Sequence, residues 1–125
     1  MNRLFFILGC LSACISVAAG AFGAHALREK LSPELLNAFE VGVKYHMYHA
    51  LGLIAVALAV SHWPNSNASA TGWLFIAGTV LFSGSLYAMS LTGVRGFGAI
   101  APVGGLLFIL GWLYLAWTIF QARGQ

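Results

Sequence analysis

Long apolar runs with few polar interruptions dominate the pattern of this sequence. Four such runs stand out, and they cover residues 4–26, 45–63, 72–91 and 100–120. The apolar positions do not alternate with polar ones as in a half-buried strand, so each run predicts a helix. About 20 apolar residues in a helix are needed to cross the ~30 Å hydrocarbon core of a bilayer. The pattern therefore predicts four membrane-spanning helices.

The polar stretch between the first two runs predicts an amphipathic extension of the second helix. It reads LREKLSPELLNAFEVGVK and covers residues 27–44. Ser32 suits the N-cap, Pro33 the first helical position and Glu34 the positive end of the helix dipole. No helix breaker follows before Pro64, so we expect one helix of about 30 residues, ~45 Å long. Its first three turns are expected to lie in the headgroup region or outside it.

One side of this second helix carries a seam that includes two histidines. Its members recur at alternating steps of four and three residues, which is the spacing of one helix face. They are Leu35, Phe39, Gly42, His46, His49, Leu53, Val56 and Val60. Both imidazoles are therefore expected to point toward the other helices.

Small residues at four-residue spacing predict close helix packing, because in lipid helices associate through close backbone approach and polar contacts. The first run carries the longest such stripe, and the third and fourth runs carry shorter ones. The positions are Ser12, Ser16, Gly20 and Ala24, then Gly84 and Ala88, and then Ala101 and Gly105.

Composition places these helices in a membrane. Hydrophobic residues make up 60% of the 125 residues and charged residues only 7%, with a mean hydropathy of +0.86. Soluble domains carry about 25% charged residues, so lipid must surround most of this surface. The sequence predicts an all-α integral membrane four-helix bundle in one domain, residues 1–125. Trp63, Trp73 and Trp117 fall where an interfacial aromatic belt is expected.

Charge and cysteine content exclude some classes of function. The net charge is +3, but the basic residues are scattered, and nucleic-acid binding would need them clustered. Cys10 and Cys14 lie four apart in one apolar helix, where a disulfide between them fits badly. We expect two small buried thiols.

The basic residues also bear on orientation. Four lie on the side of the 27–44 segment and of the loop before the fourth run: Arg28, Lys30, Lys44 and Arg95. Arg3 and Arg123 lie on the side of the termini. The positive-inside rule applied to this count favours external termini.

The polar side chains within the apolar runs gather toward one end of the expected bundle. The first run ends at a histidine, the second begins with histidines and tyrosines, and the third ends near a tyrosine. Since consecutive helices are antiparallel, these groups are expected at one leaflet, where they form a one-sided rim. The candidate ligand-binding residues are His25, Arg28, His46, Tyr48, His49, Tyr87 and Arg95.

Four sequence blocks resemble the signatures of the YgdD-like family of small four-span membrane proteins, which has a mitochondrial relative in animals. The blocks are GAFGAHAL (20–27), KYHMYHALG (44–52), LFSGSLY (81–87) and PVGG (102–105). The resemblance extends through nearly the whole chain. It implies an all-helical, multi-pass protein of the bacterial inner membrane whose function is unknown.

One departure from the family affects the candidate site. Members of the family commonly carry Gln where His46 stands, so the resemblance favours His25 and His49 as functional residues. Relatives also place basic residues on the side of the termini, which implies the opposite orientation from the count above.

Several functions are compatible with the rim. The simplest is that its polar groups join the helices, in an accessory or structural component that contacts membrane lipid and a larger membrane complex or a homo-oligomer. The alternative is binding of quinone or lipid at the His25/His49 rim, or of haem between His25 and either His49 or His46. We predict no cofactor and no metal site. The sequence contains no arrangement of nucleophile and base that would indicate an enzyme. None of the predicted spans carries a charged residue at its centre, which would indicate transport.

Overall fold

The computed structural model describes residues 2–122, so Arg123, one of the basic residues counted at the termini, lies outside the described part. In chain order the elements are α1 (Asn2–Phe22), the π-helical turn η1 (Gly23–Leu27), α2 (Pro33–His62), α3 (Ala68–Thr92), the 3₁₀ turn η2 (Arg95–Ala99) and α4 (Ala101–Gln121). Over this part of the chain, four helices are long and apolar enough to cross a membrane. The protein is an all-α, multi-pass membrane bundle, as predicted.

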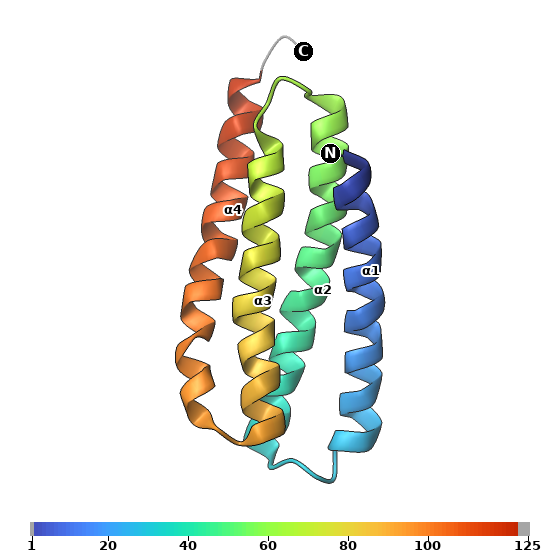
Figure 1. Cartoon of the computed structure of the whole chain (residues 1–125), viewed down its shortest axis with the longest axis vertical. Coiled ribbons are helices and arrows are strands. Elements are labelled where there is room, and N and C mark those ends of the chain that lie inside the picture. Colours follow the sequence, from blue (N-terminus) through green and yellow to red (C-terminus); the bar gives the residue numbers. More distant parts are fainter. Residues whose placement is uncertain (1, 123–125) are drawn as a thin grey trace.

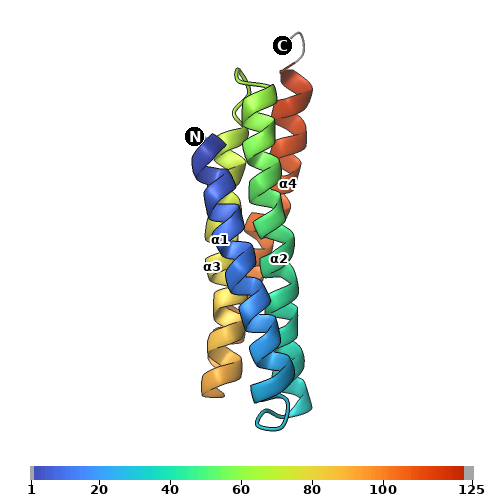
Figure 2. The same ribbon diagram turned by 90° about the vertical axis from the view of Figure 1, so that its right-hand side faces the viewer.

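The four helices follow one another side by side in chain order (Figure 1). Each packs along its length on the next, so that α2 and α3 form the centre and α1 and α4 the edges. Within residues 2–122, α1 and α4 share no substantial packing. The view from the side shows α1 crossing in front of its neighbours at a tilt (Figure 2). The bundle is therefore open, with grooves beside the central helices.

Helix α2 begins at the predicted cap. Ser32 Oγ accepts a hydrogen bond from the backbone N–H of Leu35 at 3.2 Å, and Pro33 occupies the first turn. The helix then continues without interruption to His62. The predicted amphipathic extension is its first three turns, and its inner side packs within the bundle. Phe39 there is only 3% exposed.

The core is formed by aromatic rings seated against glycines. Its buried cluster contains Phe5, Leu53, Val56, Ala57, Phe75 and Phe108. A Cβ added to Gly78 would lie 2.6 Å from the ring of Phe108, and one added to Gly104 would overlap the backbone nitrogen of Phe82. Close approach of α3 and α4 therefore depends on these two glycines.

The prediction that a stripe of small residues on α1 packs against another helix is confirmed for the first part of the stripe only. Ser12, Ser16 and Gly20 face α2, but Ala24 is exposed, and Gly23 packs against Phe39 in its place. Positions four apart turn by ~40° around a helix with 3.6 residues per turn, so the stripe rotates out of the interface.

Two further predictions about small residues are wrong. Gly84 does not mediate close packing, since no atom lies within 4 Å of the place its Cβ would take. Cys10 and Cys14 are exposed and not buried. Their side of α1 faces away from α2, because an edge helix of an open bundle leaves one of its sides uncovered by the other helices.

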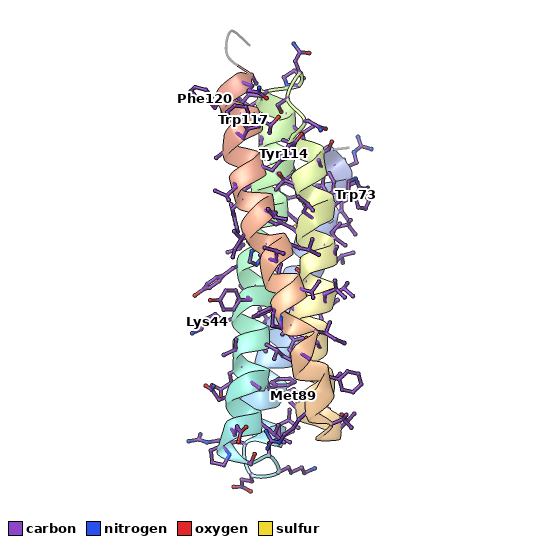
Figure 3. All side chains as sticks on the ribbon, turned by 90° about the vertical axis from the view of Figure 1, so that its left-hand side faces the viewer. Lys44, Trp73, Met89, Tyr114, Trp117 and Phe120 are labelled. Atoms are coloured by element: carbon purple, nitrogen blue, oxygen red, sulfur yellow. The ribbon has the colours of Figure 1, made fainter. Side chains whose placement is uncertain are left out.

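Aromatic side chains lie at one end of the bundle, the end that holds both the first and the last described residues of the chain. Trp73 and Trp117 are half exposed there and project outward, whereas Lys44 projects from α2 in the other half of the molecule (Figure 3). This distribution matches an aromatic belt at one membrane surface.

Candidate functional site

His46 joins three helices through its two ring nitrogens. Nδ1 lies 2.9 Å from the hydroxyl oxygen of Tyr87 on α3, and Nε2 lies 2.9 Å from Oγ of Ser12 on α1. The ring is 7% exposed. A histidine on the central helix α2 therefore cross-links the helices on both sides of it.

His49, one turn further along α2, is held equally closely. Its Nδ1 donates to the backbone carbonyl of Tyr45 at 2.8 Å, and its Nε2 accepts the indole N–H of Trp112 on α4 at 3.0 Å. The ring stacks on Phe108 with centroids 3.5 Å apart and meets the edge of Phe75. Since an indole nitrogen can only donate, the contacts define a neutral imidazole with its proton on Nδ1.

Serine hydroxyls add a second set of contacts to α2. Each donates to a backbone carbonyl of that helix: Ser16 to Val43 at 3.0 Å, Ser83 to Gly42 at 2.7 Å, and Ser90 to Leu35 at 3.0 Å. Hydrogen bonds of this kind hold helices together where lipid offers no competing partner. Among the described residues, no buried side-chain nitrogen or oxygen lacks a partner.

The two histidines lie near the middle of α2 and not at its end. Their partners Ser12 and Trp112 also lie well inside α1 and α4. The predicted rim position is therefore wrong. The first turns of α2 run beside the ends of α1 and α3, which places Tyr45 and His46 deeper than a span beginning at residue 45 implies.

The structure does not bring His25 and His49 together. His25 is exposed in η1, next to Gly23, which contacts Phe39 on α2. Phe39 precedes His49 by ten residues, a distance of about 15 Å along a helix axis. A haem group held by these two imidazoles has no geometric basis, and both nitrogens of His49 are already engaged.

The remaining candidates are divided between the outer surface and the end of the bundle. Tyr48 is 51% exposed, and its ring meets the Tyr45 ring edge to face, with centroids 5.5 Å apart. Arg28 is exposed in the turn before α2. Arg95 forms an ion pair with Glu34 between exposed side chains. Of the seven candidates, His46 and Tyr87 are hydrogen-bonded to each other, and Tyr48 and His49 border the same groove between α2 and α4.

Sequence reasoning missed Ser12 and Trp112 as histidine partners. Trp112 offers a signal in retrospect, because it lies in the middle of a run, unlike the other three tryptophans. An indole N–H in the hydrocarbon core needs an acceptor. Ser12 was expected to pack closely, and its hydroxyl adds a polar contact to that role.

Two grooves open beside the histidines. One, of about 530 Å³, lies between α1 and α3 and has Ser12, His46 and Tyr87 among its lining residues. The other, of about 790 Å³, lies between α2 and α4 and includes His49 and Trp112. Neither is lined by a charged side chain. No group of three or more His, Cys, Asp or Glu residues in the range 2–122 is placed to hold a metal ion.

Comparison with known proteins gives the family but no activity. Residues 19–105 match the family described as "Protein of unknown function (DUF423)". A UPF0382 membrane protein of Staphylococcus haemolyticus is 49% identical over 122 residues, which are 98% of this chain and 99% of that protein. The UPF0382 membrane protein YwdK of Bacillus subtilis is 46% identical over 114 residues, 90% and 93% of the two chains.

No solved structure matches the chain. The matched region covers more than half of the sequence, and the similarity to the bacterial relatives extends over nearly all of it. The chain therefore belongs to the DUF423 family of UPF0382 membrane proteins, a family of bacterial membrane proteins of unknown function.

Proposed function

We propose that this protein is a structural or accessory component of the membrane, and not an enzyme. The observation that carries the proposal is the use made of its histidines. His46 links α2 to Ser12 and Tyr87, and His49 links α2 to Trp112. Catalytic imidazoles need a nitrogen available to the reacting group. Here three of the four ring nitrogens bond a neighbouring helix, and the fourth, Nδ1 of His49, bonds the carbonyl of Tyr45 within α2.

The proposed role includes docking onto a larger membrane complex or a second copy of the chain. The edge helices support it, because α1 and α4 each pack along their length on a single helix and leave a broad apolar side outward. The resemblance to the YgdD-like family, together with the bacterial membrane proteins that the chain is similar to, supports a place in the bacterial inner membrane.

Ligand binding at the predicted rim gains less support. A site for quinone or lipid there requires His25, Arg28 and Arg95 to converge with His49. His25 lies about three turns from His49, while Arg95 is paired with Glu34. We therefore rank the scaffold role first.

The proposal is tested by asking what the protein is bound to in its own membrane. A tagged copy expressed at native level is extracted with lipid by a styrene–maleic acid polymer, cross-linked and analysed by native electrophoresis and mass spectrometry. We expect a discrete species well above the 13.3 kDa monomer with a reproducible partner or a second copy. A tagged, unrelated four-span protein is the control.

A lone monomer without a reproducible neighbour would contradict the docking role. Substrate turnover that depends on His46 or His49 would contradict the statement that the protein is not an enzyme. Val17→Trp tests which edge helix docks. Val17 is an exposed residue of α1, so the substitution changes the outer surface of α1 and leaves the histidine contacts in place.

A further inference from the structure

The groove between α1 and α3 has a polar floor within apolar walls. The two helices meet at one end, where Phe5 packs on Gly72 and Trp73, and they separate further along. The opening, about 530 Å³, is walled mainly by aliphatic side chains such as Leu11, Ile15 and Val80. This volume lies within the range of small-molecule sites, roughly 300–1,000 Å³.

The hydrogen bonds on the floor leave one hydrogen unused. A neutral imidazole carries one N–H, so Ser12, His46 and Tyr87 together offer three donor hydrogens. They form two hydrogen bonds with one another, and the described structure contains no other bond from these hydroxyls. With the proton on Nε2 the Ser12 hydroxyl keeps its hydrogen, and with the proton on Nδ1 the Tyr87 hydroxyl keeps its own.

Either way the spare hydrogen belongs to a hydroxyl that lines the groove. A polar hydrogen facing a lipid environment gains from an acceptor. No charged side chain lines this opening, so an ionic headgroup would find no counter-charge. A complementary molecule is neutral, apolar over most of its surface, and carries an oxygen acceptor.

We propose that the α1/α3 groove binds a neutral, lipid-soluble molecule through a carbonyl oxygen, which accepts the spare hydrogen of the Ser12–His46–Tyr87 chain. The ring carbonyl of a quinone and the ester carbonyl of an uncharged glyceride share this chemistry. The site differs from the rim expected from the sequence, since it uses Ser12 and lies in the interior of the helices. It adds a ligand to the scaffold role and does not depend on it.

The second groove serves as an internal comparison. Beneath it, the His49 N–H donates to the carbonyl of Tyr45 and the Trp112 N–H donates to His49. Two donors form two bonds, and no hydrogen of these buried groups remains for a ligand. The other hydroxyl donors that line this opening, Tyr45 and Tyr48, are exposed side chains, so a carbonyl there would meet no buried chain of hydrogen bonds like that of Ser12, His46 and Tyr87.

Glycines in the two grooves provide matched variants. Gly84 lines the α1/α3 groove with open space where its Cβ would stand, and Gly105 lines the α2/α4 groove with only Phe82 at 3.8 Å from that point. Gly84→Leu places a side chain in the first groove, where its Cβ meets no atom within 4 Å, and leaves Ser12, His46 and Tyr87 unchanged in sequence. Gly105→Leu fills the second. Val80→Trp, at an exposed position beside the first groove, is a second blocking variant should Gly84→Leu fail to fold.

The experiment measures equilibrium binding of three probes to the full chain in dodecyl maltoside. The probes are a benzoquinone with a decyl tail, dioctanoylglycerol, and decylbenzene, which has the tail and ring but no carbonyl. We expect saturable one-to-one binding of the quinone or of the glyceride. The probe that binds shows whether the carbonyl of the natural ligand belongs to a quinone or to a glyceride. Binding should weaken about tenfold or more in Gly84→Leu or Val80→Trp and stay unchanged in Gly105→Leu.

The infrared carbonyl band of the bound probe reports on the hydrogen bond directly. It should shift to lower frequency than in empty micelles. Three outcomes would overturn the proposal: no saturable binding of either carbonyl probe, equal binding of decylbenzene, or unchanged affinity in both blocking variants. An unshifted carbonyl band would also overturn it, because the groove would then hold only an apolar tail.

Discussion

Trp112 on α4 donates its indole N–H to Nε2 of His49 on α2, with the two nitrogens 3.0 Å apart. These residues belong to helices whose backbones do not approach each other closely within the described chain. The bond therefore ties α4 to α2 across the ring of Phe108, on which His49 stacks. It gives the open bundle a contact that backbone packing alone does not provide.

Trp112→Phe tests this contact. The variant keeps an aromatic ring but leaves Nε2 of His49 without a donor, and interhelical hydrogen bonds in membranes contribute about 0.5–2 kcal/mol. We expect the free energy of unfolding to fall by that amount, measured by steric trapping in bicelles. Trp117→Phe is the matched control, because Trp117 is half exposed near the end of α4. Equal losses in the two variants would show that the bond to His49 adds nothing.

The second prediction concerns the cross-link at His46. Ser12→Ala and Tyr87→Phe each remove one hydrogen bond to the same imidazole. Residues that share a partner are coupled, by about 0.5–3 kcal/mol in double-mutant cycles. We expect the double variant to deviate from the sum of the single ones. The pair Tyr87→Phe and Thr71→Val, whose hydroxyl bonds Gly111 on α4 instead, should be additive. Additivity in both pairs would argue against a connected chain.

The sequence was sufficient for the helices and for the inner face of α2, because both are encoded locally. Apolar length sets the spans, and the spacing of Phe39, His46 and His49 sets the face they share. The sequence was insufficient to predict how far each histidine lies from the end of the bundle. The ends of the apolar runs predict one alignment of the helices. In the structure the first turns of α2 pack beside the ends of α1 and α3, so His46 and His49 lie deeper than His25.

The partners of the histidines also lay beyond sequence reasoning. Ser12 is 34 positions from His46, and Trp112 is 63 positions from His49. Which residues meet across helices depends on tilt and register, and these follow from how side chains such as Phe82 and Phe108 fit against Gly104 and Gly78. A pattern along one helix does not contain that information.

The glycines of α3 and α4 give a third prediction. Gly104→Ala would place a methyl group against the backbone of Phe82, which cannot move aside as a side chain can. Overpacking of this kind costs about 1–3 kcal/mol, and we expect a corresponding loss in the free energy of unfolding. Gly84→Ala enters open space and should be neutral or stabilise by up to about 1 kcal/mol, since Ala favours a helix over Gly. The reverse order would mean that α3 and α4 pack differently.

The exposed cysteines allow a test of how the edge helix faces the bilayer. Cys10 and Cys14 lie on the outer side of α1, so a spin label on either, with the other changed to Ala, should collide readily with dissolved oxygen and rarely with a water-soluble nickel complex. Ser16→Cys in a background lacking both cysteines is the control. Ser16 is fully buried against Val43, and a label there should meet neither reagent or should disrupt packing. Low oxygen collision at both native positions would show that another protein or a second copy covers this side of α1, which would locate the docking surface on α1.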